Sequence, residues 1–525
     1  MSKTIAAKTP WLLAGVLGAC LMQAAPPERT ITVREYQDKV QGAWIGQVIG
    51  AIFGWPFEGR PKSVVHLDHY LPSHHFQTNY EYAPVDDDYF YEMVALYGFE
   101  RFGPNMTVEQ LGDVWKEHQA GSWGSSLEAR LLMEKGIRAP DTGHPRYNKW
   151  FHTIGPQFSS DIYGMIAPGM INLAGAIARR YSHVNGYAEG SDGAVFVASC
   201  VSQAFFRRNP EDIVRRAAQM IDPRSNYRKA IDQVLDGHAR GVSWRDLAHQ
   251  TEMRWRPDYP QVNNAVANGA LVAIGVLYGD GDFLRSMNVV TQLADFADTD
   301  CNAANVGSIL GAMNGVNAIP GNLKAQFHDR IWGESMGPVK FDHVVEEKIS
   351  DLASRIAAFG LKNLAANGVT ARRESGEEVL HIPDEDPRTQ ALEYFDINDY
   401  GPLWNPAWKL DAAGRGGAGT TWLDGDALIT FPRDARPVRL ETDAAIPSGR
   451  PRLTVDVAAD AGKPWRLEVF VDDESIHVET VDSPWHAVTV DLARFAGRKA
   501  NVRLYQEAIN AVPQSAWWRK ARIGD

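Results

Sequence analysis

The chain has 525 residues, which is too long for one ordinary domain, so we expect two or three folding units. Its 65 acidic residues outnumber its 53 basic ones, and the resulting formal charge of -12 argues against a protein that binds a nucleic-acid backbone through a basic face. Three cysteines are too few for a disulfide framework, so stability must come from buried apolar residues.

The first 25 residues have the pattern of an export signal. Lys3 and Lys8 precede an apolar stretch over 11–22. We predict a signal peptide or a lipoprotein signal over 1–25; a lipoprotein signal would leave Cys20 as an acylated first residue. The apolar stretch is shorter than the ~20 residues that span a bilayer. We therefore expect an exported protein, periplasmic or extracellular, with a lipid anchor as one alternative and no transmembrane span in the mature chain.

Residues 30–365 have the composition and periodicity of a helical domain. Ala, Leu and Met are frequent, and apolar residues recur with spacings of three and four. Gly42, Gly46, Gly50 and Gly54 fall at every fourth position, which places them in one stripe along a helix. The stripe predicts that a second helix packs very closely against the first. We predict an all-α domain.

Two groups of aspartates lie within this helical domain. Asp86, Asp87 and Asp88 stand together, and Asp298 and Asp300 lie one residue apart before a helix of small residues. Carboxylates held together repel one another unless protons or a cation neutralise them, and Mg²⁺ prefers oxygen ligands. The two groups therefore predict a metal site. The alternative for either group is a helix cap, because an aspartate at a helix start accepts backbone hydrogen bonds and opposes the helix dipole.

The sequence pattern changes after the helical domain. Residues 366–395 are charged and contain proline, which is typical of a linker. Apolar and polar residues then alternate within 396–525, over 452–457, 465–471, 487–492 and 500–504. This alternation predicts a β-sandwich or jelly roll.

Residues 485–498 are similar to part of the galactose-binding-like jelly rolls that are attached to many secreted glycan-active enzymes. The similarity implies a carbohydrate-binding-like domain over 396–525. A module of this kind either binds sugar or braces the enzyme, and the sequence leaves both open.

The glycine stripe, Glu58 and the two aspartate groups, in this order, resemble the ADP-ribosylglycohydrolase family, which includes the dinitrogenase reductase-activating glycohydrolase. The resemblance covers roughly residues 35–335. It implies an orthogonal bundle of helices around a cleft that holds one or two Mg²⁺ ions, or Mn²⁺. It also implies hydrolysis at the anomeric carbon of a ribosyl group.

Two short motifs carry the ligands that the resemblance implies. Asp86 and Cys301 stand where the family carries threonine, and Ala51 stands where many members carry an acidic residue. Soft sulfur is a poorer ligand for Mg²⁺ than a hydroxyl, which leaves open whether one or two metals bind. The implied metal ligands are Asp86, Asp87, Asp88, Asp298, Asp300 and Cys301.

A third set of residues is predicted to contact the substrate. A Pro-Gly pair follows Gly164, which predicts an irregular loop of the kind where function often lies. For Tyr163 and His183, packing within the core is the alternative. The predicted substrate contacts are Asp161, Tyr163, Gly164, His183 and Asn302.

These features predict an exported, metal-dependent glycohydrolase that acts on a small molecule or glycan. Catalytic roles fall to Glu58, Asp87 and Asp300, with a carboxylate taking the proton of a metal-activated water that attacks the anomeric centre. The leaving group is left open between ADP-ribosyl on a protein and a glycan or nucleoside. Two alternatives remain: a non-catalytic binding or structural protein on the same fold, and a surface lipoprotein whose helical domain presents the sandwich.

Overall fold

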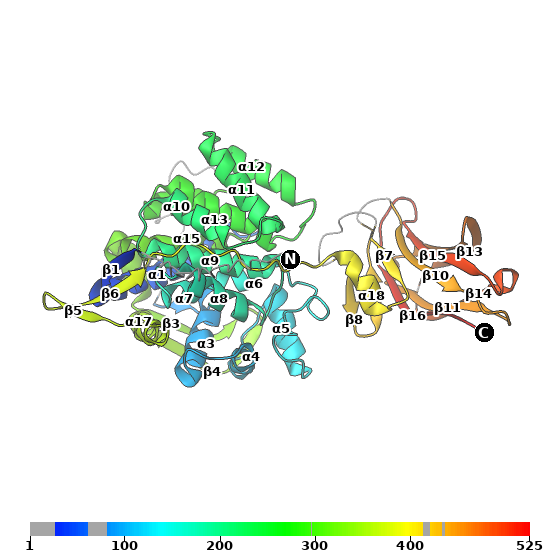
Figure 1. Ribbon diagram of the computed structural model, residues 1–525, viewed down its shortest axis with the longest axis horizontal. Helices are drawn as coiled ribbons and strands as arrows, with labels where there is room; N and C mark the ends of the chain where they lie inside the picture. Colours follow the sequence, from blue (N-terminus) through cyan, green and yellow to red (C-terminus); the bar gives the residue numbers. More distant parts are fainter. Residues whose placement is uncertain are drawn as a thin grey trace, which may run out of the picture.

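The computed structural model describes residues 27–60, 81–293, 295, 297–412, 420–432, 436–482 and 484–525. The predicted signal over 1–25, with Cys20, lies outside them. The described residues form a helical domain followed by a smaller β-domain (Figure 1), which confirms the predicted fold class. Among the helices in these ranges, none has both the length and the apolar character needed to cross a bilayer.

Helices build most of the first domain, and one contiguous core of buried apolar residues joins them. The longest, α1, carries the glycine stripe. These helices are α1 (Val33–Gly54), α3 (Asp87–Phe102), α4 (Val108–Glu117), α5 (Gly124–Glu134), α6 (Gly155–Phe158), α7 (Asp161–Met165), α8 (Ile171–Ser182), α9 (Glu189–Ala204), α10 (Pro210–Gln219), α11 (Asn226–Ala239), α12 (Trp244–Trp255), α13 (Ala265–Gly279), α14 (Phe283–Val290), α15 (Thr299–Asn314), α16 (Gly321–Lys324) and α17 (Ile349–Ala366).

Two small sheets accompany these helices, which the expectation of a purely helical domain did not include. In the first sheet β2 pairs with β3 in parallel and β3 pairs with β4 in antiparallel fashion. In the second, β6 lies between β1 and β5. The strands are β1 (Glu28–Thr32), β2 (Ala83–Pro84), β3 (Arg330–Met336), β4 (Val339–Lys348), β5 (Arg372–Glu374) and β6 (Glu377–Pro383).

The segment predicted as a linker, 366–395, is anchored to the helical domain. Its β5–β6 hairpin pairs with β1, so residues 377–383 lie beside residues 28–32. Residues 384–396, which we call the strap, then run in extended form across the helical domain towards the β-domain. The strap begins close to the first described strand.

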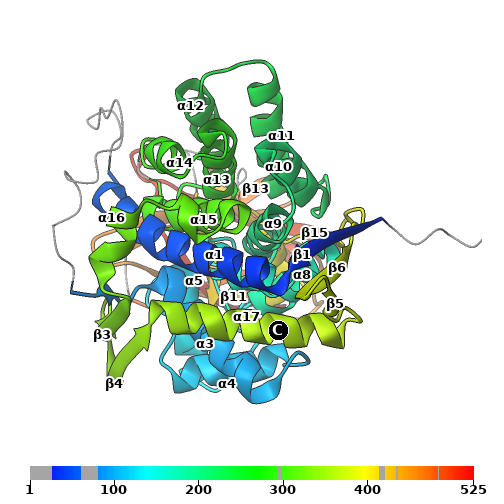
Figure 2. The same cartoon turned by 90° about the vertical axis from the view of Figure 1, so that its left-hand side faces the viewer.

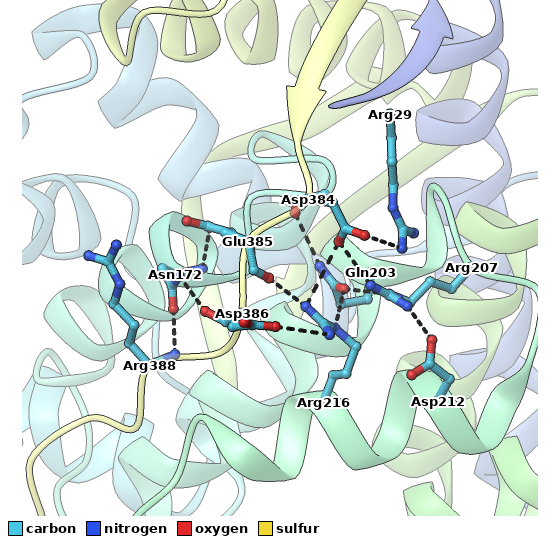
Figure 3. Close-up of polar contacts among 11 residues, drawn as sticks. Arg29, Asn172, Gln203, Arg207, Asp212, Arg216, Asp384, Glu385, Asp386 and Arg388 are labelled. Carbon is cyan, nitrogen blue, oxygen red and sulfur yellow. Dashed lines mark hydrogen bonds and ion pairs between the residues drawn. The ribbon is translucent and has the colours of Figure 1, made fainter. Parts of the chain in front are cut away.

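Arginines hold the start of the strap (Figure 3). The Asp384 carboxylate accepts hydrogen bonds from Arg29 at 2.6 Å and from Arg207 at 3.0 Å, and Arg216 lies 3.9 Å away. Two residues further along the strap, the backbone carbonyl oxygen of Asp386 accepts a hydrogen bond from Asn172 Nδ2 at 3.0 Å. Because several side chains surround one partly buried carboxylate, this end of the strap is fixed rather than loosely tethered.

The β-domain is a sandwich of two five-stranded antiparallel sheets around one core. The sheet orders are β13-β12-β15-β10-β7 and β14-β11-β16-β9-β8. Strand β12 alternates buried and more exposed residues, and inside the core the rings of Trp465 and Trp518 lie 4.8 Å apart. A short helix, α18 (Tyr400–Trp404), precedes the strands. They are β7 (Lys409–Asp411), β8 (Trp422–Asp424), β9 (Ala427–Thr430), β10 (Val438–Ala445), β11 (Arg452–Ala459), β12 (Trp465–Val471), β13 (Glu474–Val481), β14 (His486–Asp491), β15 (Lys499–Glu507) and β16 (Ala516–Gly524).

Contacts at the end of the strap join the two domains. The Tyr400 hydroxyl donates to the Pro145 carbonyl at 3.0 Å, and the Phe395 ring lies 5.5 Å from that of Phe151. Tyr400 is fully buried and belongs to the core of the β-domain, so its hydroxyl links that core to the helical domain. The end of the strap therefore packs against the helical domain as well.

Candidate active site

The glycine stripe of α1 packs against α15, as predicted. A Cβ added at Gly50 would lie 2.2 Å from the Ala303 carbonyl oxygen, and one added at Gly54 would lie 2.2 Å from the Asp300 Cα. Figure 2 shows α1 running alongside α15 on one side and α17 on the other. The backbones of α1 and α15 therefore touch along the glycine stripe. The contact brings the start of α15, with Asp300, next to the end of α1.

The starts of α3 and α15 carry the two aspartate groups. Asp86 caps α3, since its Oδ1 accepts a hydrogen bond from the Asp88 backbone N–H at 3.2 Å. Asp298 stands at the corresponding position of α15, where its side chain makes no capping hydrogen bond within the described part of the chain. Its backbone N–H donates instead to Asn268 Oδ1, which also accepts from Asn302 Nδ2. The cap interpretation therefore applies to Asp86 and not to Asp298.

Helix α1, its 3₁₀ extension over Trp55–Phe57, α3 and α15 bring the acidic residues together. The ligand atoms of Asp88, Asp300 and Cys301 lie within 4.8 Å of one another, and so do those of Glu58, Asp298 and Asp300. Asp300 belongs to both groups. We call the whole set the carboxylate cluster: Glu58, Asp86, Asp87, Asp88, Asp298 and Asp300, with the Cys301 thiol.

Several oxygen atoms of this cluster have no hydrogen-bond donor. Both Oδ atoms of Asp88 and Oδ1 of Asp298 are buried and unpartnered among the described residues. A buried carboxylate oxygen without a partner is costly unless a proton or cation compensates it. The residues present therefore fit a hard divalent cation such as Mg²⁺ or Mn²⁺, with the soft sulfur of Cys301 as the exception.

Burial raises the pKa of each aspartate in the cluster. It raises the pKa of Asp86 from 3.8 to about 6. The pKa values of Asp87 and Asp88 are raised well above 3.8, first by burial and then by the neighbouring carboxylates. Burial likewise raises the pKa of Asp298, and burial together with the Asp298 charge raises that of Asp300. The aspartates therefore cannot all be ionised together without a compensating positive charge.

These shifts predict how the stability of the metal-free protein depends on pH. A carboxyl whose pKa is raised in the folded state stabilises fully below its unfolded pKa of about 3.9, and this contribution is lost as pH rises through the folded pKa. For Asp86, with a folded pKa of about 6, the loss is on the order of 3 kcal/mol. We expect the thermal midpoint in chelator to fall between pH 5 and pH 8, and saturating Mg²⁺ to raise it more at pH 8.

Thermal unfolding at the two pH values, with chelator and with Mg²⁺, measures both effects. The pH series with chelator is the control for unrelated titrations, because Mg²⁺ acts only on groups that bind it. An equal Mg²⁺ effect at pH 5 and pH 8 would contradict the idea that these carboxyls take up protons in the absence of the cation.

A cavity of about 1050 Å³ opens over the cluster. Glu58, Asp86, Asp87, Asp298, Asp300 and Cys301 line it, whereas Asp88 is fully buried beneath. Its walls include three tryptophans and several polar residues: Trp55, Trp123, Trp150, Ser125, Ser126, Thr153, Gln261 and Asn263. Trp55 and Trp123 are 38% and 46% exposed. Exposed aromatic faces beside hydroxyl and amide groups suit a ligand that is part apolar and part hydroxylated.

The predicted substrate contacts lie elsewhere. Tyr163 is buried, with its ring 5.4 Å from that of Tyr181, and a Cβ at Gly164 would lie 2.4 Å from the Ala198 carbonyl oxygen. His183 Nε2 lies 2.8 Å from Glu393 of the strap. Residues 161–165 form the short buried helix α7 rather than an irregular loop. None of these side chains lines the cleft in the described part of the chain.

Asp161 and Asn302 lie in a buried polar layer behind the cluster. Asp161 Oδ2 accepts from Asn305 Nδ2 at 2.7 Å, and Gln47 Nε2 lies 3.5 Å from the same atom. Gln47 Nε2 also donates to the Asp88 backbone carbonyl at 2.9 Å. Burial and the Asp161 charge raise the pKa of the adjacent Glu92 well above its usual value. Asp161 and Asn302 therefore support the cluster from the core, and Asn302 does so through its hydrogen bond to Asn268.

The sequence interpretation missed the residues of this layer and of the cleft walls. Gln47, Glu92 and Asn268 are buried polar residues that each interrupt an apolar run, over 42–54, 89–98 and 265–279, and that contrast is a signal in the sequence. Trp123 precedes Gly124 at the start of α5, and Asn263 precedes α13. Nothing local distinguishes these two from other residues at helix ends.

The family comparison agrees with this geometry. The model of the ADP-ribosylglycohydrolase family matches residues 32–359, more than half of the chain. The chain belongs to the ADP-ribosylglycohydrolase family. This family assignment confirms the resemblance found in the sequence. Membership supports a glycohydrolase function, and the family is typically metal-dependent, in agreement with the acidic groups of this family member.

Other comparisons place this ADP-ribosylglycohydrolase family member among known proteins. None of the curated proteins matches it. It is similar to a solved ADP-ribosylglycohydrolase-related protein complex with 17% identity over 63% of this chain and 99% of the other, at a TM-score of 0.41. A CBM4 structure matches with 12% identity over 23% and 88% at 0.19, and a carbohydrate binding module of family 29 with 15% over 20% and 70% at 0.16.

Proposed function

We propose that this protein is an exported, metal-dependent glycohydrolase that cleaves the bond at the anomeric carbon of an ADP-ribosyl or other furanosyl unit. The observation that carries the proposal is the pair of ligand groups that share Asp300 at the floor of an open cleft. An acidic cluster without function would be expected to lose its buried like charges, since they oppose folding.

The proposed metal is Mg²⁺, with Mn²⁺ as a substitute. Asp88, Asp298 and Asp300 would hold it, with Asp86, Asp87, Glu58 and Cys301 close by. When bound, the cation supplies positive charge for sugar hydroxyls and for a water molecule whose pKa it lowers. Because the soft Cys301 sulfur is a poor ligand for Mg²⁺, we favour one strongly held ion over two equal ones.

The chain's own residues divide the remaining tasks. Glu58 is exposed at the cleft edge and has ligand atoms close to those of Asp298 and Asp300, which suits a base that takes the proton of the attacking water. Asp87 is the partly exposed carboxylate of the first group and would accept a hydrogen bond from a sugar hydroxyl. Asp300 Oδ1 accepts from the Cys301 backbone N–H at 3.0 Å, so its orientation is fixed. Positioning and electrostatic stabilisation would supply most of the rate acceleration.

The proposed substrate class follows from the two ends of the chain. Protein ADP-ribosylation is mostly intracellular, whereas the predicted signal over 1–25 directs this protein to export. The appended sandwich is typical of enzymes that act on glycans. We therefore favour a furanosyl unit of a glycan or nucleoside over an ADP-ribosylated cytosolic protein.

A hydrolysis assay with defined metal content tests this function. Chelator-treated protein is expected to be inactive and to regain activity with Mg²⁺ or Mn²⁺. The panel comprises an ADP-ribosylated peptide, nucleosides, small furanosides and furanose-containing oligosaccharides, with released sugar as the readout. If the protein hydrolyses no member of the panel and calorimetry detects no saturable metal binding, the non-catalytic alternative replaces the enzyme.

A further inference from the structure

A row of tryptophans crosses one sheet of the sandwich. Trp422 in β8 pairs with Ile429 in β9, Ile429 pairs with Trp517 in β16, and Trp517 pairs with Ala458 in β11. The pairing of β11 with β14, continued by one residue, places Trp485 beside Ala458. Directly paired residues share a face of the sheet. The three tryptophans therefore lie on one face.

This face is the outer one. Trp518, the neighbour of Trp517, is fully buried in the sandwich core, and successive residues of a strand point to opposite faces. Trp422, Trp485 and Trp517 are all partly exposed. The rings of Trp485 and Trp517 meet edge to face at 6.4 Å. The three rings are therefore partly open to solvent, although Trp422 also packs against the edge of the core and Ile429, between Trp422 and Trp517, is buried.

Polar groups border the aromatic row. Trp517 Nε1 donates to Asp460 Oδ1 at 3.1 Å, and the Arg519 guanidinium lies 4.4 Å from the centre of the Trp485 ring. Arg519 is itself held by Asp426 at 2.8 Å. These contacts restrict the rings before any ligand arrives, which lowers the entropic cost of binding. A sugar ring has an apolar face and a rim of hydroxyls, and aromatic rings beside charged hydrogen-bonding groups match both.

The row begins beside the cleft. The Lys149 ammonium lies 4.7 Å from the centre of the Trp422 ring and 5.6 Å from that of Trp150. Trp150 belongs to the cleft wall. In Figure 1, β8 lies on the side of the sandwich that faces the helical domain, and β14 lies further away. The row therefore leads from the cleft across the sandwich.

The length of the row argues for an extended ligand. Trp422 and Trp485 are separated by four strand spacings of about 4.8 Å, or roughly 19 Å. One furanosyl unit in the cleft reaches neither Trp517 nor Trp485. A chain of sugar rings whose end enters the cleft can contact both sites at once.

We propose that the row of Trp422, Trp517 and Trp485 binds the remainder of a glycan chain whose terminal furanosyl unit enters the cleft. The substrate is then an oligosaccharide or polysaccharide. Binding of the glycan by the row is independent of the proposed function, whereas cleavage of its terminal furanosyl unit in the cleft rests on that function. Binding at two connected sites raises the effective concentration of the chain end at the cleft.

Affinity electrophoresis of the full chain tests the row without requiring catalysis. The probes are arabinan, xylan and mixed-linkage glucan, each cast in the gel. Wild type is expected to be retarded by at least one of these polymers. The Trp517→Ala and Trp485→Ala variants are expected to bind that polymer about tenfold more weakly, and the Trp422→Ala variant is also expected to bind it more weakly than wild type. Trp244→Ala is the matched control, because Trp244 is also partly exposed and stacked under an arginine, Arg245, but lies on α12.

The possible outcomes separate this proposal from the proposed function. No retardation of wild type by any of the three polymers overturns the glycan row, whether or not small furanosides are hydrolysed. Equal retardation of wild type and Trp517→Ala, or equal weakening in Trp244→Ala, overturns it as well. For a polymer that is both bound and hydrolysed, the row variants are expected to raise KM about tenfold while leaving hydrolysis of a small furanoside unchanged.

Discussion

Asp300→Asn is expected to abolish turnover while leaving the protein folded. Asp300 is the residue that both ligand groups share, and asparagine keeps its shape but removes its charge. Loss of an outer partner of a metal ligand alone costs up to roughly 100-fold in affinity or activity. Loss of a shared ligand is therefore expected to lower kcat/KM at least 100-fold. Calorimetric titration with Mg²⁺ is expected to show the matching loss of saturable binding.

The change in unfolding temperature that Asp300→Asn causes in the metal-free protein also has an expected direction. Because burial and the Asp298 charge raise the pKa of Asp300, removing its charge relieves repulsion in the folded state. Asp300→Asn in chelator is expected to unfold at the same or a higher temperature than wild type at pH 8, and Mg²⁺ is expected to add little. A variant that is inactive merely because it is misfolded would instead unfold at a lower temperature.

Asp280→Asn provides the matched control for this experiment. Asp280 is an exposed aspartate in the left-handed region at the end of α13, a conformation that asparagine tolerates well. Turnover and Mg²⁺ binding are expected to match wild type. If Asp300→Asn also bound Mg²⁺ like wild type, Asp300 would not be a ligand, and Asp86 and Asp87 would become the main candidates.

Local patterns explain why much of the fold could be predicted from the sequence. The alternation over 465–471 predicted a strand, and β12 covers the same residues with buried side chains at every second position. The fourfold spacing of Gly42 to Gly54 predicted a close helix contact, which α15 provides. Both patterns depend on residues near one another in the chain, where periodicity directly reflects which face is buried.

Contacts between distant segments could not be predicted in this way. The interpretation of 366–395 as a linker rested on charge and proline, yet Asp384 is held by Arg29 and Arg207, which lie 355 and 177 residues away along the chain. A charged residue looks the same in the sequence whether it is solvated or paired. The pairing of β1 with β6 joins the two ends of the helical domain, and no local pattern indicates such a partner.

The same distinction applies to the site. The aspartates could be recognised because each group is compact in sequence and precedes a helix. The position of Asp161 could not, because α7 is a single short helix whose place in the core depends on Asn305 and Gln47 from two other helices. The cleft walls come from separate connections, among them those before α5 and α13. A cleft assembled from distant loops has no compact signature in the sequence.

Gly50→Ala is expected to destabilise the protein by about 3 kcal/mol, although alanine is the better helix former. Intrinsic propensity alone favours alanine over glycine by roughly 1 kcal/mol within a helix. The added Cβ would nevertheless lie 2.2 Å from the oxygen and 2.5 Å from the carbon of the Ala303 carbonyl. These are backbone atoms, so α15 must move as a whole, and overpacking of a tight core costs 1–3 kcal/mol or more. Denaturant unfolding measures the difference.

The displacement of α15 also links this packing to the proposed chemistry. Asp300 lies in the first turn of α15, so Gly50→Ala is expected to weaken Mg²⁺ binding although residue 50 contributes no ligand. Gly321→Ala is the control, because a Cβ there meets no described atom within 4 Å and propensity alone decides. The control is expected to be neutral or slightly stabilising. If Gly50→Ala behaved like Gly321→Ala in both measurements, the close contact of α1 and α15 would not be what holds Asp300 in place.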